Sequence, residues 1–197
     1  GGDTAFVQIV GSHTNVVRIE KNGEVLLNKP FSEEAAQPPE SRRSLTVEDI
    51  IAFADEVDLD DVRAPIARQI EYNTAIAEAG LTGQYGAAIG KILLDSYGDS
   101  VQNRAKAWAA AGSDARMNGC EKPVVINSGS GNQGMTASLP VIVYARELKA
   151  SEEQLYRALV VSNLVTIHLK TGIGSLSAYC GATSAGAGAG AGICYLY

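Results

Sequence analysis

The hydrophobic period of this chain changes near residue 45, and that change constrains the fold more than any other feature. Residues 4–29 hold three short β-prone runs, and Asn22-Gly23 separates two of them. Asn-Gly is the strongest short hairpin signal, because both residues tolerate a positive φ. From residue 46 onward, apolar residues recur three and four positions apart, as on one face of a helix. The sequence therefore predicts a mainly α (α+β) chain: a helical domain with a small antiparallel β element at the N-terminus.

A proline-containing, charged stretch separates these two parts. Residues 30–45 contain Pro30, Pro38 and Pro39, which is typical of a loop or linker. We therefore divide the chain into a small β-hairpin segment with its linker at 1–45 and a helical, catalytic-type domain at 46–197. The first residue is Gly rather than Met, and the last residues are apolar and carry no stop signal. On this basis the chain is interpreted as an internal fragment, truncated at both ends.

Capping residues indicate where the helices begin and end. Thr46 is a candidate N-cap, and Ser151 with Gln154 matches a capping box that opens a helix to about His168. A second helix is expected to begin after Asp60 or Asp61 and to end at Ala79, with Gly80 as its stop. Two further helices are expected at Gln84–Tyr97 and Asp99–Ala111.

An alternating Ala-Gly tract at residues 185–192 has two interpretations, a silk-like strand or a helix. We favour the helix, in which glycines four apart allow a close approach to another helix or a ligand. Each such glycine costs about 1 kcal/mol relative to Ala, so a packing or functional reason is expected. The segment from Gly172 to Tyr197 has no charged residue. Small residues dominate it, so we expect a buried helix rather than a membrane span.

Composition narrows the class of protein. The chain has 197 residues, 46% hydrophobic and 19% charged, as in an ordinary soluble globular protein. Its net charge is −6, and Arg42-Arg43 is the one basic pair that stands out. We therefore expect no nucleic-acid partner and no membrane partner. Three cysteines do not make a secreted disulfide scaffold, so a reducing, cytoplasmic location is expected. The chain could also form a homo-oligomer, and the sequence does not decide its oligomeric state.

The segment Ser128–Gly134 carries the main candidate site. It follows a β-prone run at Val124–Ile126 and satisfies the pattern GxGxxG. A dinucleotide site also needs an acidic residue at the end of a second strand, but Glu147 lies in a helical run and Pro140 interrupts the expected helix. Two interpretations stay open: a plain glycine-rich turn, or a site whose backbone N–H groups and polar side chains bind a carboxylate and an amine. The candidate substrate-binding residues are Ser128, Gly129, Ser130, Gly131, Asn132, Gln133 and His168.

The cysteines and one asparagine give weaker signals. No CxxC pair is present, so a structural zinc site is not indicated. Cys194 lies between apolar residues and is expected to be a small buried hydrophobe. Cys180 precedes the glycine-rich helix, a position that favours the thiolate. Asn73 lies on an apolar helix face, either as a structural residue or pointing into the site, and His13 is expected at a surface turn.

Three motifs together resemble a known family. Asn118-Gly119-Cys120, Pro123 and Asn127–Gly134 are similar to the central signature of the L-cysteine desulfidase family, which is related to the L-serine dehydratase α chain. Tyr179–Gly192 is similar to the second signature of that family. Ser12–Asn15 with the Asn22-Gly23 hairpin resembles its β segment. The likeness extends over nearly the whole chain.

The resemblance implies an iron–sulfur lyase. The implied reaction is α,β-elimination of L-cysteine to pyruvate, ammonia and sulfide, with L-serine dehydration as the alternative. The implied cofactor is a [4Fe-4S] cluster held by three cysteines, with Cys180 and Cys120 as the matching metal ligands. The family's other cysteines lie in regions that this chain does not contain, so we expect the fragment itself to be inactive. A non-catalytic amino-acid-binding domain and a purely structural helical domain are the other possibilities.

Overall fold

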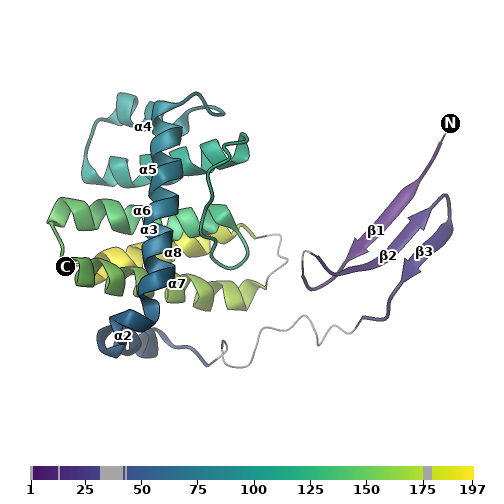
Figure 1. The fold of residues 1–197 in the computed structure, drawn as a ribbon, viewed down its shortest axis with the longest axis horizontal. Helices are drawn as coiled ribbons and strands as arrows, with labels where there is room; N and C mark the ends of the chain where they lie inside the picture. Colours follow the sequence, from purple (N-terminus) through teal and green to yellow (C-terminus); the bar gives the residue numbers. More distant parts are fainter. Residues whose placement is uncertain (1, 13, 32–41, 43, 175–178) are drawn as a thin grey trace.

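The computed structural model describes residues 2–12, 14–31, 42, 44–174 and 179–197. A small antiparallel sheet is followed by a bundle of long helices (Figure 1). The predicted fold class is therefore confirmed. In chain order the elements are β1 (Ala5–Ile9), β2 (Val16–Lys21), β3 (Glu24–Asn28), α2 (Val47–Glu56), α3 (Leu59–Thr82), α4 (Ile89–Tyr97), α5 (Val101–Met117), α6 (Gly131–Leu148), α7 (Glu152–Ile173) and α8 (Gly181–Tyr195).

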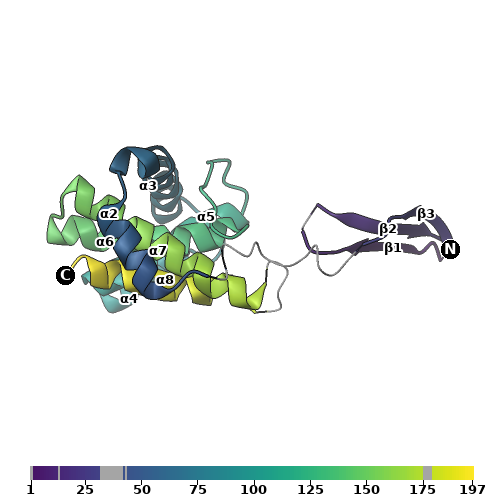
Figure 2. The ribbon, with the colours of Figure 1, turned by 90° about the horizontal axis from the view of Figure 1, so that it is seen from below.

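The sheet has the order β1-β2-β3, and both strand pairs are antiparallel. Asn22 and Gly23 join β2 to β3 with φ angles of 50° and 84°, so the predicted hairpin turn is confirmed. Val17 is the one apolar side chain that is buried among the described residues of the sheet. No strand contacts a helix among the described elements, and Figure 2 shows the sheet beside the bundle. The predicted linker falls largely on residues outside the described part.

The core of the bundle lies around α6 and α7. Val141 and Ile142 of α6 pack with Leu159 and Val161 of α7, and all four side chains are buried. α8 runs antiparallel to α7 along its whole length (Figures 1 and 2). The helical interpretation of the Ala-Gly tract is thus confirmed.

Glycine explains how closely α8 approaches α7. A Cβ atom at Gly188 would overlap the hydroxyl of Thr166, and one at Gly192 would lie 2.7 Å from the Ala158 carbonyl oxygen and 2.9 Å from Ser162 Cβ. A Cβ atom at Gly186 or Gly190 would instead have no described atom within 4 Å. Alternate glycines of the tract therefore serve packing, and the others do not.

Several predicted helix limits are correct and others are wrong. Thr46 caps α2, and the Ser151–Gln154 capping box opens α7. The second helix begins two or three residues earlier than expected, with Asp58 as its N-cap, and it continues through Gly80. Gly80 does not stop the helix because it serves a contact: a Cβ there would overlap the backbone of Ala111 on α5.

Two other limits also differ, and local backbone conformation explains the first of them. The predicted helix Gln84–Tyr97 begins only at Ile89, since Gly86 and Ala88 have positive φ angles of 50° and 52°. α5 continues to Met117, six residues beyond the expected end at Ala111. Pro140 does not interrupt α6, which is continuous through it.

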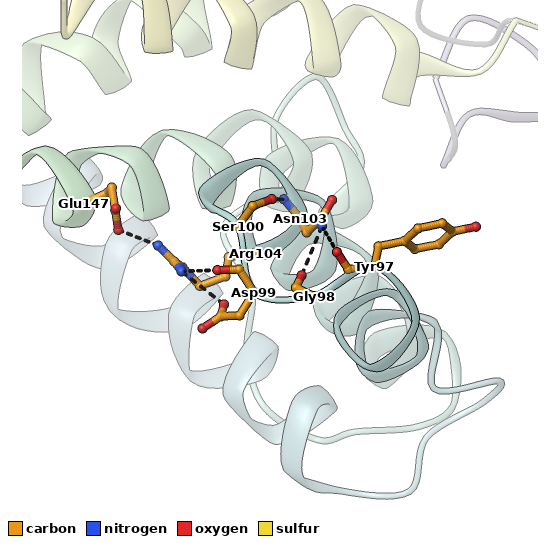
Figure 3. Close-up of polar contacts among 7 residues, drawn as sticks. All are labelled: Tyr97, Gly98, Asp99, Ser100, Asn103, Arg104 and Glu147. Atoms are coloured by element: carbon orange, nitrogen blue, oxygen red, sulfur yellow. Dashed lines mark hydrogen bonds and ion pairs between the residues drawn. The ribbon is translucent and has the colours of Figure 1, made fainter.

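The turn between α4 and α5 is held by two side chains (Figure 3). Asn103 Nδ2 donates to the carbonyl oxygens of Tyr97 and Gly98 at 2.8 and 3.0 Å. Arg104 binds Asp99 and also reaches Glu147 at the end of α6. Glu147 therefore joins the end of α6 to α5.

Candidate functional site

The predicted loop is a tight turn that leads directly into α6. The backbone groups of Asn127 and Ser130 exchange two hydrogen bonds of 3.1 Å, and the central residues Ser128 and Gly129 have φ angles of 49° and 84°. Two central residues with positive φ define a type I′ turn. Ser130 Oγ then accepts from the Gln133 N–H as the N-cap of α6. The four residues Asn127–Ser130 therefore connect the preceding run directly to α6.

The β-prone run before the turn, at Val124–Ile126, does not form a β-strand. It lies irregular and extended, and the side-chain amide of Asn73 takes the place of a neighbouring strand. Val125 N–H donates to Asn73 Oδ1 at 2.9 Å, and Asn73 Nδ2 donates to the Val125 carbonyl at 3.3 Å and to Ser138 Oγ at 3.0 Å. Asn73 is fully buried, and its role is structural.

A second amide network holds the turn itself. Gln69 on α3 and Asn163 on α7 exchange hydrogen bonds of 3.0 and 2.8 Å. Asn127 Nδ2 donates to Asn163 Oδ1 at 2.9 Å, and Ser128 Oγ donates to Asn127 Oδ1 at 2.8 Å. The turn is therefore fixed to two helices that are far apart in sequence. Sequence reasoning missed Gln69 and Asn163, although a polar amide within an apolar helix was a signal for both.

The first turns of α6 and α8 meet. The side-chain amide of Gln133, in the first turn of α6, lies flat against Gly181, the first residue of α8, where any Cβ atom would overlap it. Gln133 is 7% exposed, and its Oε1 is buried with no hydrogen-bond partner among the described residues. Helix N-termini carry free N–H groups and a positive dipole end. Two such ends therefore converge beside an unsatisfied acceptor.

An arginine lies on the other side of the α6 N-terminus. A Cβ atom at Gly131 would lie 2.5 Å from Arg116 Nε, so the absence of a side chain lets Arg116 cross this residue. Arg116 Nη1 donates to Asn132 Oδ1 at 3.2 Å. Arg116 is exposed and has no carboxylate partner in the part of the chain that the structure describes. The sequence alone gave no signal for this residue, because the contact spans α5 and α6.

The three cysteines occupy different environments. Cys180 is the exposed N-cap residue of α8, next to Gly181 and so beside Gln133, and its side chain makes no capping hydrogen bond. Cys120 is half-buried in an apolar cluster that includes Met135, and a hydrogen bond with it raises the pKa of Tyr85. Cys194 is exposed, not buried as expected.

The described cysteines do not gather into a metal site. Cys180 and Cys194 are 14 residues apart on one helix, which is about 21 Å at 1.5 Å per residue. Within the described ranges, no three His, Cys, Asp or Glu side chains lie close enough to hold a metal ion. The roles of Cys180 and Cys120 as ligands therefore stay predictions.

The histidines add little to the site. His168 is half-buried near the end of α7, and the described contacts include no hydrogen bond between it and residues 128–134. Its role in substrate binding stays a prediction. His13 lies outside the described residues.

Comparisons with known proteins identify the family. The family model described as serine dehydratase alpha chain matches residues 13–197. The chain therefore belongs to the serine dehydratase alpha-chain family. No solved structure matches the chain. None of the described helices is long and apolar enough to cross a membrane.

The similar curated proteins carry uninformative names. A UPF0597 protein of Desulfitobacterium hafniense (strain Y51) is 60% identical over 97% of this chain and 44% of the relative. UPF0597 proteins of Lachnoclostridium phytofermentans and Treponema denticola are 54% and 52% identical over 100% and 99% of this chain, in each case 47% of the relative. The chain thus spans less than half the length of these relatives.

Proposed function

We propose that the protein to which this chain belongs is an amino-acid lyase that eliminates the side-chain heteroatom of L-serine or L-cysteine, giving pyruvate and ammonia. The family match supports a lyase of the serine dehydratase type. The name of the family supports L-serine directly, whereas L-cysteine rests on the resemblance of the motifs around Cys120 and Cys180. The observation that carries the proposal is the meeting of the α6 and α8 N-termini at Gln133 and Gly181.

The chemistry sets three requirements. A base must remove the Cα proton, the leaving group must be withdrawn, and the substrate carboxylate must be held in place. The chain's own residues meet the third requirement best. The turn at Asn127–Ser130 leads into α6, whose first N–H groups, at Gly131 and Asn132, have no acceptor among the described residues, and such groups bind anions. The described residues do not single out a base.

An iron–sulfur cluster does not fit the described cysteines alone. The residue Cys180 is exposed beside the candidate site, whereas Cys120 is packed against apolar side chains and Cys194 lies at the far end of α8. A cluster held by three cysteines therefore needs thiols beyond these. We propose Cys180 as the one ligand from this chain and assign no catalytic step to the cluster.

The proposal is tested by anaerobic purification and assay of the full-length relative from Desulfitobacterium hafniense together with this chain. Iron and acid-labile sulfide are measured, and pyruvate is followed with L-serine, L-cysteine and D-serine. We expect pyruvate from an L-substrate with the full-length protein and none from D-serine. Absence of pyruvate from both L-substrates in iron-loaded protein would contradict the lyase function.

The role of Cys180 has a separate test. In the full-length protein, the variant equivalent to Cys180→Ala is expected to lose most of its iron, and the variant equivalent to Cys194→Ala is expected to keep it. Equal iron in both variants would remove Cys180 from the metal ligands without affecting the assignment of the reaction.

A second function is favoured by the separation of the cysteines: Cys180 and Cys194 lie at opposite ends of α8, and Cys120 packs in a different cluster. This chain alone could bind a small amino acid without turning it over. Calorimetry of the chain with L-serine and L-cysteine is then expected to give saturable heat. A flat titration would argue against binding by this part of the protein.

A further inference from the structure

We propose that Arg116, Gln133 and the first N–H groups of α6 and α8 form a recognition site for the head group of an α-amino acid. The carboxylate lies against Arg116 and the helix N-termini, and the ammonium group donates to Gln133 Oε1. This assignment rests on the proposed function, because it names how that same site holds its substrate.

The backbone supplies the first part of the site. Gly131 and Asn132 N–H groups have no acceptor among the described residues, and the same holds for the N–H groups of Gly181 and Ala182. The helices they begin have 18 and 15 residues, so both have developed dipoles. A single carboxylate placed between the two ends would satisfy N–H groups of both.

Arg116 supplies a fixed positive charge on one side. Only its Nη1 donates to described protein atoms, to Asn132 Oδ1 at 3.2 Å and weakly to Met117 Sδ at 3.5 Å. The remaining N–H groups of the guanidinium face no described carboxylate. A guanidinium whose fork is free binds a planar carboxylate through two hydrogen bonds. Asn132 thus orients Arg116 without neutralising it.

Gln133 supplies the complementary acceptor on the other side. Residues 131 and 133 differ by about 200° around the helix axis, at 100° per residue, so Arg116 and Gly181 flank the α6 N-terminus from opposite sides. Gln133 Oε1 is buried and lacks a donor in the described part of the chain. Buried acceptors in native proteins are almost always satisfied. An ammonium group next to the bound carboxylate is the donor that this geometry lacks.

Three ligands separate the two halves of the site. L-Alanine carries both charged groups and has no leaving group, propionate carries the carboxylate alone, and L-alaninamide carries the ammonium alone. Binding to this 197-residue chain is followed by 1H–15N NMR titration. We expect the largest shifts at the N–H groups of Gly131 and Gly181, and we expect L-alanine to bind at least tenfold more tightly than propionate or L-alaninamide.

Variants then assign the side chains. Arg116→Gln should weaken the binding of L-alanine and of propionate at least tenfold and leave the binding of L-alaninamide unchanged. Arg116→Lys should restore part of the lost affinity. Gln133→Met should lower the affinity for L-alanine to that for propionate and leave the affinity for propionate unchanged. Lys106→Gln removes the same charge from an exposed position on α5 and should change none of the three.

Clear outcomes would overturn the proposal. Propionate that binds equally to wild type and Arg116→Gln excludes Arg116, and shifts confined to residues away from α6 and α8 exclude the site. If Gln133→Met does not fold, the comparison of ligands on the wild-type chain still tests the role of Gln133 Oε1. Equal affinities of the wild-type chain for L-alanine and propionate would exclude Gln133 Oε1 as the acceptor of the ammonium group. These readouts need no turnover. If the full-length protein is an active lyase but the Arg116→Gln variant of the chain binds the ligands normally, this site is wrong and the proposed function stands. If the chain binds the ligands as expected but the full-length protein forms no pyruvate, the lyase function is wrong and the binding site stands.

Discussion

At the scale of single residues, Asn73 shows how one amide can replace a β-strand. It gives Val125 both of the hydrogen bonds that a neighbouring strand would supply, and it adds a bond to Ser138. Buried backbone groups that lose their partners carry the full cost of desolvation. The position of the turn before α6 therefore depends on a side chain more than 50 residues earlier.

Asn73 and its neighbour Thr74 give opposite predictions. Asn73→Ala should lower the free energy of unfolding by about 2–4 kcal/mol, because three buried hydrogen bonds are lost and a cavity forms. Thr74 Oγ1 is buried and has no partner among the residues that the structure describes, so Thr74→Val should be neutral or stabilising by up to about 1 kcal/mol. Urea unfolding of both variants measures the two values. If Asn73→Ala lowers the free energy of unfolding by less than a surface substitution does, the proposed role of Asn73 in holding Val125 is contradicted.

Tyr195 gives a prediction about pH. Burial, together with a hydrogen bond that its hydroxyl donates to Asp55, raises the pKa of Tyr195 to about 12. An unfolded tyrosine has a pKa near 10. The folded state therefore holds this proton more tightly, and the resulting stability is fully present below pH 10 and is lost as the pH rises toward 12.

The measurement compares Tyr195→Phe with wild type in urea between pH 8 and pH 12. Wild type should be the more stable at pH 8, and the difference should shrink above pH 10. Tyr97→Phe is the control, because Tyr97 is 72% exposed and its hydroxyl has no described partner. A difference that is independent of pH, or equal in the two variants, would contradict the assignment.

At the scale of elements, α8 shows why an uncharged Ala-Gly helix is stable in this protein. Its glycines cost helix propensity, and the cost is offset where a missing Cβ atom allows contact with α7. Gly188 faces Thr166 and the Ser162 carbonyl, whereas no described atom lies within 4 Å of a Cβ added at Gly186. The two positions have the same residue type and helix but different surroundings.

Alanine at each position separates packing from propensity. Gly188→Ala should destabilise the chain by about 1–3 kcal/mol, because the added methyl group overlaps α7. Gly186→Ala should stabilise it by about 0.5–1 kcal/mol, since Ala favours the helix and restricts the unfolded chain. Thermal unfolding followed by circular dichroism measures both. Equal effects of the same sign would show that α8 does not pack as described.

At the scale of the whole molecule, the sheet and the bundle form two separate sets of contacts. No described strand contacts a helix, and Phe6, Val7, Ile9, Val25 and Leu26 of the sheet are all 45–58% exposed. A three-stranded sheet with one buried apolar side chain gains little from burial. The division at residue 45 stays a prediction.

Deletion of residues 1–31 tests this division. The helical part should keep its free energy of unfolding to within about 0.5 kcal/mol, because sites without shared contacts are additive. Urea unfolding is followed by the fluorescence of Trp108, which packs in the bundle, so the signal reports on the helices alone. A loss of several kcal/mol after the deletion would show that the strands stabilise the bundle.

Features determined by neighbours in sequence were predictable. The Asn22-Gly23 turn, the Thr46 cap and the Ser151–Gln154 capping box each depend on residues at most three positions apart, and the structure contains all of them. The position of Cys180 at the start of α8 followed from the same local reasoning. A glycine-rich turn was one of the two interpretations for Ser128–Gly134, and the β-prone run before it does not form a strand.

The sequence by itself determined the helical class and the hairpin, because these depend on local backbone preferences and on the period of apolar residues. Only the tertiary structure decided that Gly80 packs against α5 rather than ending a helix, that Asn73 holds Val125, and that Arg116 and Gly181 lie on either side of the α6 N-terminus. The physical reason is that these contacts join segments more than 14 residues apart, and their formation depends on how closely whole helices approach one another.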